Sequence, residues 1–260
     1  MEPPLTTPIP PDREFFTTRD GRRVPALSVA EIREVDRVAV EQTGPTLLQM
    51  MEHAGTELAQ AALELLGDDW RSSKVTVLAG GGNNGAGGVC AARQLANRGV
   101  TVLVVSIRRP TEADGALGQQ LLALAEAPAE VITWDAAFDI SEADVVIDAV
   151  IGTGLREAPR ARQMALIRAA QAARGPVLSL DVPSGVDADS GEAPGFAVQP
   201  ACTLTLGLPK QGLTRENAGD LWLSDLGIPP GVFARAGIAF PPVFGQETRL
   251  RLRYPGETGN

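Results

Sequence analysis

Apolar positions in the central part of the chain occur in short runs separated by longer segments of helical periodicity. Most of these runs lack apolar–polar alternation, which is typical of strands buried on both faces of a parallel sheet. The pattern therefore predicts an α/β fold with a largely parallel sheet covered by helices on both sides. The predicted strands are residues 74–79, 100–106, 129–133, 145–151, 176–180, 201–206 and 221–224.

Two helices are expected before the first of these strands. Ser28, followed three residues later by Glu31, has the pattern of a capping box and predicts a helix over about residues 28–40. Apolar residues at helical spacing predict a second helix over residues 46–66, with Leu47, Met50, Met51, Ala54 and Leu58 on one face. Between the strands, helices are predicted at residues 89–98, 116–127 and 161–174.

The ends of the chain differ in composition from its middle. Residues 1–26 hold five prolines by position 11 and suggest an arm that is poorly ordered or wraps a neighbour. Residues 27–229 form the predicted domain. Residues 230–260 are a C-terminal tail that the pattern does not place.

Composition narrows the class of protein. With 260 residues, 44% of them hydrophobic, the chain can bury the core of one globular domain. A net charge of −9 argues against a general nucleic-acid or acidic-membrane binder, and no apolar stretch reaches membrane-spanning length. We expect a soluble, cytoplasmic protein. Cys90 and Cys202 are expected to be reduced core thiols, and a single histidine, His53, argues against a zinc site.

A glycine-rich segment follows the first predicted parallel strand. Residues 80–88 contain six glycines and include Asn83 and Asn84. Glycines allow positive φ and close approach of backbone N–H groups, and a helix expected just afterwards would point its N-terminus at the same place, so the segment predicts a phosphate site. The alternative is a tight strand-to-helix turn without a ligand.

Polar residues also end two later strands of the predicted sheet. Asp148 lies in an otherwise apolar run, and Asp181 and Ser184 follow the next strand. Ligands of parallel sheets bind beyond the carboxyl ends of the strands, and a carboxylate in an apolar strand is costly unless it is paired or ligated. Together they suggest a site. Taken singly, each aspartate also has a purely structural explanation: Asp148 could cap the following loop, and Asp181 could form an Asx-turn.

A nicotinamide-dependent dehydrogenase is one enzyme class to weigh, because residues 80–85 satisfy the G-x-G-x-x-G spacing. The next strand ends at Ser106 without an acidic residue, although Arg108 and Arg109 could serve a 2′-phosphate. The only tyrosine, Tyr254, lies in the tail. An NAD(P)-dependent oxidoreductase is therefore the less favoured enzyme class.

Five blocks of sequence, in order, resemble the NAD(P)H-hydrate epimerases, also called the YjeF N-terminal domain or apolipoprotein A-I-binding-protein family. The resemblance covers about residues 27–229 and implies a three-layer α/β/α Rossmann-like sandwich, often a homodimer. It further implies epimerisation of hydrated NADH or NADPH, with K⁺ as cofactor. The blocks are residues 48–55, 79–85, 146–155, 179–187 and 204–212.

The resemblance assigns roles to individual residues. Asp181 would contact the altered nicotinamide ring and is the candidate acid/base, while Asp148 and the cation would polarise the reacting oxygen. The cation ligands would be Asn84, Asp148 and Ser184, all of which offer oxygen atoms. The substrate-binding residues would be Asn83, Asn84, Gly85, Ala86, Gly87, Gly152, Thr153, Gly154, Leu155, Arg156, Glu157, Ala158 and Asp181.

The chain departs from the family pattern at two positions. Gly87 stands where the family typically has aspartate, and His53 stands where it commonly has asparagine. The alternative to an active epimerase is therefore a catalytically impaired nucleotide-binding or scaffold module of the same fold.

Overall fold

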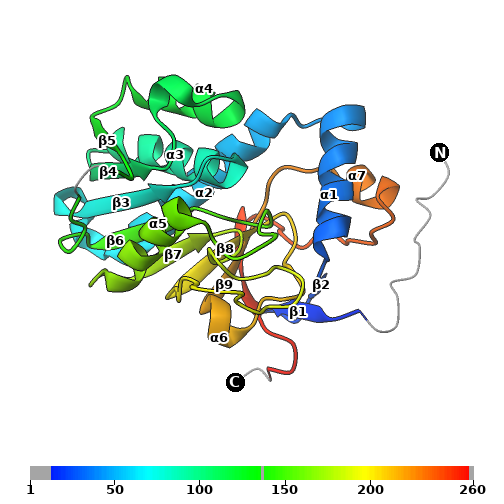
Figure 1. Ribbon diagram of the computed structural model, residues 1–260. Coiled ribbons are helices and arrows are strands. Elements are labelled where there is room, and N and C mark those ends of the chain that lie inside the picture. Colours follow the sequence, from blue (N-terminus) through cyan, green and yellow to red (C-terminus); the bar gives the residue numbers. More distant parts are fainter. Residues whose placement is uncertain (1–12, 136–137, 258–260) are drawn as a thin grey trace.

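The computed structural model describes residues 13–135 and 138–257, and these form one ten-stranded sheet with helices on its two faces (Figure 1). The strand order is β2-β1-β10-β9-β8-β7-β6-β3-β4-β5. From β5 to β9 all neighbours are parallel, whereas β10, β1 and β2 extend the sheet in antiparallel fashion. The predicted α/β class and largely parallel sheet are confirmed.

The strands follow the predicted apolar runs closely. The parallel strands are β3 (Lys74–Ala79), β4 (Thr101–Ser106), β5 (Ala129–Thr133), β6 (Val145–Ala149), β7 (Val177–Leu180), β8 (Cys202–Leu206) and β9 (Asp220–Ser224). The antiparallel strands are β1 (Phe15–Thr18), β2 (Arg23–Pro25) and β10 (Arg249–Arg253).

The helices cover the sheet in two layers (Figure 1). They are α1 (Val29–Val38), α2 (Leu47–Leu66), α3 (Asn83–Ala96), α4 (Gly115–Leu124), α5 (Ala161–Ala172), α6 (Arg215–Ala218) and α7 (Pro230–Arg235). Helices α2, α3 and α4 pack against one another and share a core with the strands, while α5 packs on the opposite face. A π-helical turn, Ala39–Thr43, follows α1, and short 3₁₀ turns occupy Gly67–Ser72 and Pro110–Glu112.

Side chains of the central strands alternate between the two layers. In β3, Val75 and Val77 belong to the core beneath α2 and α3, whereas Leu78 belongs to the core beneath α5. Because strand side chains point to opposite faces in turn, an apolar run without alternation is what this doubly covered sheet requires.

Two helix starts were predicted correctly. The Ser28 hydroxyl accepts a hydrogen bond from the Glu31 N–H, and the Glu31 carboxylate accepts one from the Ser28 N–H. Thr46 and Gln49 form the same reciprocal arrangement at the start of α2. The predicted apolar face of α2 is confirmed, since Met50, Met51, Ala54 and Leu58 are buried.

The prediction for the glycine-rich segment was wrong in one respect. Helix α3 begins at Asn83 rather than near residue 89, so the later glycines of the segment are helical, and none of its glycines has positive φ. Gly80, Gly85, Gly87 and Gly88 serve close packing instead. A Cβ on Gly80 would lie 1.9 Å from the Val150 carbonyl oxygen, and one on Gly88 would lie 2.5 Å from Ala149 Cβ. Helix α3 can therefore pack directly on the sheet.

The two ends of the described chain meet at one edge of the sheet. Residues 13–25 contain the hairpin of β1 and β2, and β1 pairs with β10 from the tail. Apolar residues of this edge share a core with α1 and α7. The proline-rich residues 1–12 lie outside the described residues. The division into arm, domain and tail stays a prediction, but parts of the arm and of the tail complete the sheet.

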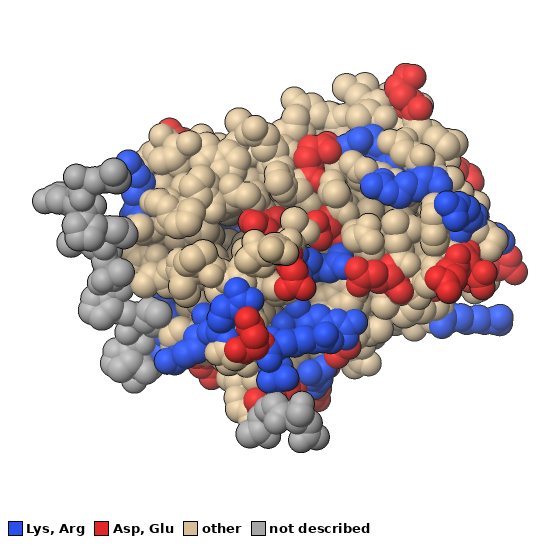
Figure 2. Space-filling view, turned by 180° about the vertical axis from the view of Figure 1, so that it is seen from behind, with Lys and Arg blue, Asp and Glu red and all other residues tan. Residues whose placement is uncertain are grey.

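Basic side chains on the back of the molecule alternate with acidic ones (Figure 2). Two arginines belong to the antiparallel edge. Arg249 forms ion pairs with Glu57 and Glu64, and Arg251 Nη1 lies 3.9 Å from Asp220 Oδ2. Arg249 is therefore neutralised by its neighbours, whereas Arg251 shares Asp220 with Arg215. Within the described residues, no helix is long and apolar enough to cross a membrane.

Candidate functional site

A cavity of about 460 Å³ opens beyond the carboxyl ends of the parallel strands. It lies where the strand order reverses, between the loops that follow β3 and β6. Ligands of open α/β sheets bind at this kind of reversal. Helices α1 and α2 form part of its wall, together with the loops after β4, β7 and β8 and with Phe233 of α7.

Asp181 lines this cavity and has a strained backbone. It is the one described residue other than glycine with positive φ, at 70°, and it follows the last residue of β7 directly. Its carboxylate forms an ion pair with Lys210 and accepts a hydrogen bond of 3.1 Å from the Thr153 N–H. Backbone strain of this kind persists where the surroundings hold it and is often found at functional sites.

Lys210 is a functional candidate that the sequence interpretation missed. Its side chain is 1% exposed, and its ammonium donates to the Asp181 carboxylate, to the Leu206 carbonyl oxygen at 2.9 Å and to the Thr205 hydroxyl at 3.3 Å. A lysine is almost never fully buried unless it is paired. The available signal was a lone lysine just after the apolar strand β8.

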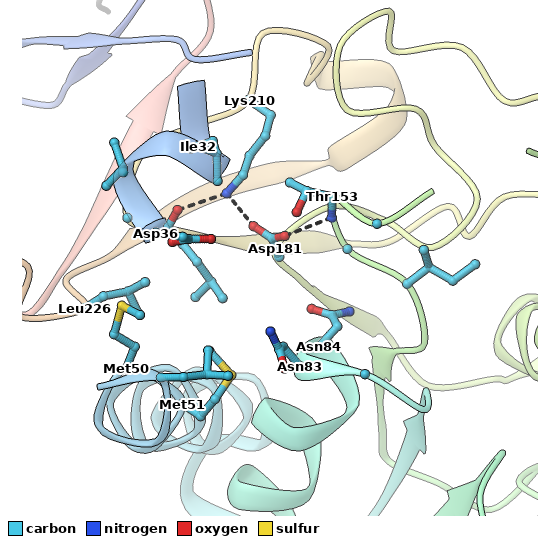
Figure 3. Close-up of a pocket in the computed structure, with 18 of the residues that line it drawn as sticks. Ile32, Asp36, Met50, Met51, Asn83, Asn84, Thr153, Asp181, Lys210 and Leu226 are labelled. Atoms are coloured by element: carbon cyan, nitrogen blue, oxygen red, sulfur yellow. Dashed lines mark hydrogen bonds and ion pairs between the residues drawn. The ribbon is translucent and has the colours of Figure 1, made fainter. Parts of the chain in front are cut away.

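Asp36 was also missed, because α1 precedes the segments that carried the resemblance. It lines the cavity and is solvent-exposed. The surrounding protein still removes part of its hydration and raises its pKa to about 6; the charge of Lys210 opposes this shift and that of Asp181 adds to it. Figure 3 shows Asp36, Lys210 and Asp181 on one side of the cavity, with Asn83 and Asn84 opposite.

The N-terminus of α3 forms that opposite side. Asn83 and Asn84 line the cavity, and so does Arg108, whose side chain runs past Gly81. The Asn84 side-chain nitrogen is buried and has no hydrogen-bond partner among the described residues. A Cβ on Gly152 would lie 2.5 Å from Asp181 Oδ2 and 3.1 Å from Asn84 Oδ1, so the loops after β6 and β7 and the N-terminus of α3 meet here.

Asp148 lies outside the cavity lining and is completely buried. Its carboxylate accepts hydrogen bonds from the Ser184 hydroxyl at 2.5 Å, the Ser184 N–H at 2.9 Å, the Ser179 hydroxyl at 2.8 Å and the Val150 N–H at 3.3 Å. Burial raises the pKa of Asp148, and these hydrogen bonds oppose the shift. The alternation of β6 directs Asp148 to the face of Val146, beneath α5.

The other predicted site residues divide into two groups. Asn83, Asn84, Gly152, Thr153, Gly154 and Asp181 line the cavity. The second group does not line the cavity. Three of its members, Gly85, Ala86 and Gly87, are buried within α3, and the other four lie further along the loop after β6: Leu155, Arg156, Glu157 and Ala158. Roles for both groups stay predictions.

The remaining candidate side chains lie away from the cavity lining. His53 is exposed, beside Gly227. Cys90 and Cys202 are free and buried, as expected, and burial raises the pKa of each thiol to about 12. These thiols are structural. No group of three or more His, Cys, Asp or Glu side chains among the described residues could hold a metal ion.

The fold and the site together define an α/β sandwich with a ligand cavity at the reversal of its parallel strand order. Comparison with known families makes this specific: residues 47–212 match the family described as YjeF-related protein N-terminus. The chain belongs to this family.

The relatives agree with this membership. An NAD(P)H-hydrate epimerase of Dehalogenimonas lykanthroporepellens is 48% identical over 86% of this chain and 90% of that protein. A bifunctional NAD(P)H-hydrate repair enzyme, Nnr, of Hyperthermus butylicus is 39% identical over 79% of this chain, which covers 39% of that protein. The crystal structure of yeast ynu0, YNL200c, has a TM-score of 0.75 and 25% identity, covering 87% of this chain and 99% of that one.

Proposed function

We propose that this protein is an NAD(P)H-hydrate epimerase, an isomerase that interconverts the R and S epimers of hydrated NADH and NADPH. The observation that carries the proposal is the ion pair of Asp181 and Lys210, held within a cavity whose opposite side is the N-terminus of α3. The relative of 48% identity, which covers most of this chain, bears the same name.

The cavity has suitable groups for the two ends of such a substrate. The unpaired N–H groups at the start of α3 and the Arg108 side chain provide positive charge for the pyrophosphate. Met50 and Met51 of α2 offer an apolar surface to the rings. The hydrated nicotinamide would then lie against Asp181.

The reaction needs proton transfer at one carbon. C6 of the substrate carries a hydroxyl and is bonded to the ring nitrogen, so loss of that hydroxyl leaves a flat iminium that water can re-enter from either face. The departing oxygen must gain a proton and the entering water must lose one. Asp181, paired with Lys210 as a carboxylate, can accept the proton of the entering water.

We also propose K⁺ as the cofactor of this site. The oxygens beneath the cavity suit a hard cation: they are the Asp148 carboxylate, the Ser184 hydroxyl and the Ile151 carbonyl, 3.2 Å from that hydroxyl. The unpartnered amide of Asn84 supports this, because exchange of its nitrogen and oxygen positions would present an oxygen instead. Bound K⁺ would supply positive charge beside the substrate.

Epimerisation of one purified isomer tests the function. The protein is incubated with a single epimer of hydrated NADPH, and the epimer ratio is followed by chromatography against the spontaneous rate. We expect Asp181→Asn to reduce turnover by about 10²-fold or more, because the titratable group is lost. Asparagine tolerates positive φ, so the strained backbone is retained. A wild-type rate equal to the spontaneous rate would favour the impaired nucleotide-binding or scaffold module.

The homodimer also remains a proposal. It rests on the family resemblance, and light scattering of the purified protein tests it directly.

A further inference from the structure

Four charged side chains line the cavity, and the proposed chemistry has so far used three of them. Arg108 and Lys210 are cations, and Asp181 is the partner of Lys210. The fourth, Asp36, has no hydrogen-bond partner for its carboxyl group among the described residues. A charged group that lines a cavity without a protein partner is available to a ligand.

All three N–H groups of the Lys210 ammonium have other acceptors, so none is left to donate a hydrogen bond to Asp36. An ammonium group has three N–H donors. The acceptors of Lys210 are the Asp181 carboxylate, the Leu206 carbonyl and the Thr205 hydroxyl. Lys210 therefore acts on Asp36 through its charge, while the Asp36 carboxyl stays free to bond with a ligand.

The other charged side chains of α1 and α7 do not line the cavity. On α1, which carries Asp36, Arg37 pairs with Glu34 and Glu41 at the surface. Helix α7, which packs against α1, contributes Phe233 to the cavity lining, whereas its Arg235 does not reach the lining. The charged groups that line the cavity with Asp36 are thus Lys210 and Asp181, on the same side as Asp36, and Arg108.

We propose that Asp36 is the second proton carrier of this site, complementary to Asp181, an inference that rests on the proposed epimerase function. In one direction, the Asp36 carboxylic acid gives its proton to the hydroxyl at C6. The C–O bond breaks, its electron pair leaves with the oxygen as water, and the ring nitrogen lone pair forms the iminium. Water then adds to C6, and its proton passes to the Asp181 carboxylate.

The two carboxyl groups exchange protonation states in each turnover. Asp36 ends as a carboxylate and Asp181 as an acid, so atoms and charge balance without another reactant. The next turnover runs in reverse from this state, or a proton returns through the water of the cavity. Two carboxyl groups in different surroundings are a common way to hold an acid and a base at one pH.

The titration of Asp36 suits this division of labour. With a pKa of about 6, Asp36 retains a proton over a higher pH range than an ordinary aspartate. The acid form is needed for departure of the hydroxyl, so kcat/KM in this direction, which reports the pKa of the free enzyme, should fall as pH rises through about 6.

Variants at Asp36 test the inference. Asp36→Asn has nearly the same shape, and we expect its kcat to fall by about 10²-fold with little change in KM. The decrease in activity near pH 6 should be absent from the pH profile of this variant. Asp36→Glu should recover part of the rate and shift the pH of that decrease. Glu34→Gln, on the same helix but at the surface, is the matched control and should keep the wild-type profile.

The pH dependence of folding stability provides an independent test of how Asp36 titrates. The native pKa of Asp36, about 6, lies above its ordinary value of 3.8, so the native state binds the proton more tightly. The stability of wild type relative to Asp36→Asn should therefore fall as pH rises from about 4 to about 6 and then level off.

The outcomes separate the two claims. Suppose that wild type epimerises and that Asp36→Asn keeps both the wild-type kcat and the decrease in activity near pH 6. The role of Asp36 is then overturned and the epimerase function stands. If wild type does not epimerise above the spontaneous rate, the function itself fails. A stability difference that is flat with pH would show that Asp36 titrates as an ordinary carboxyl and would also overturn the inference.

Discussion

Lys210 and Asp181 form a buried ion pair that joins the loops after β8 and β7 at the cavity. The lysine side chain is 1% exposed and that of the aspartate 11%. Removing one member of a buried pair leaves the other charge uncompensated, which is much more costly than losing an exposed pair. The pair therefore contributes to the stability of the site as well as to its proposed chemistry.

Lys210→Met should lower the free energy of unfolding by about 3–5 kcal/mol, because Asp181 loses its partner in a buried position. Urea denaturation measures this change. Lys74→Met is the control: Lys74 pairs with Glu142 at 2.8 Å, but both side chains are more than half exposed, so the loss should stay below about 1 kcal/mol. Equal losses in the two variants would contradict the importance of burial.

Gly152→Ala should impair turnover and also lower stability, because it disturbs the buried ion pair of Asp181 and Lys210. Its methyl group would lie 2.5 Å from Asp181 Oδ2 and would displace the carboxylate from its present position. Gly231→Ala, at an exposed position of α7 outside the cavity lining, serves as the control, because its added methyl has no heavy atom of another segment within 4 Å. Epimerisation assays of both variants, with their melting temperatures, decide the matter; a normal rate in Gly152→Ala would count against Asp181 as the reacting group.

Gly87→Asp restores the aspartate typical of the family, and its backbone φ is not positive. The position is nonetheless buried in α3, and a Cβ there would lie 2.8 Å from Leu180 Cδ2. We therefore expect lower stability and no gain in activity. Gly87→Ala separates steric crowding from the cost of burying a charge, since it adds only the methyl group. A more active Gly87→Asp enzyme would show that Leu180 can move aside.

Potassium should raise the melting temperature of the wild-type protein, because a ligand that binds only the native state stabilises it. Sodium at the same ionic strength is the control. Ser184→Ala removes one proposed ligand and leaves the Asp148 carboxylate in place, so its response to potassium should be weaker. Identical curves for wild type and Ser184→Ala would remove Ser184 from the ion site.

The helix that carries the glycine segment illustrates where local patterns fail. Glycines are poor helix formers, so Gly85, Gly87 and Gly88 favour a loop when only the sequence is considered. In the structure they are helical, and a Cβ at these positions would collide with Gly80, Leu180 or Ala149, so glycine is what allows α3 to approach the sheet this closely. Tertiary packing overrides helix propensity at these positions.

The sequence by itself determined the order of β3 to β9 and of α1 to α5 along the chain and the positions of Asp148 and Asp181 near the ends of two strands, but it did not place β1, β2 and β10. Both follow from periodicity, which is a local property of the chain. Only the tertiary structure decided that Asp181 lines the cavity while Asp148 is buried. The outcome depends on the face of the sheet to which Asp148 points and on the positive φ of Asp181. The tertiary structure also brought Asp36 and Lys210 to Asp181, because contacts between segments far apart in sequence arise only when the sheet is assembled.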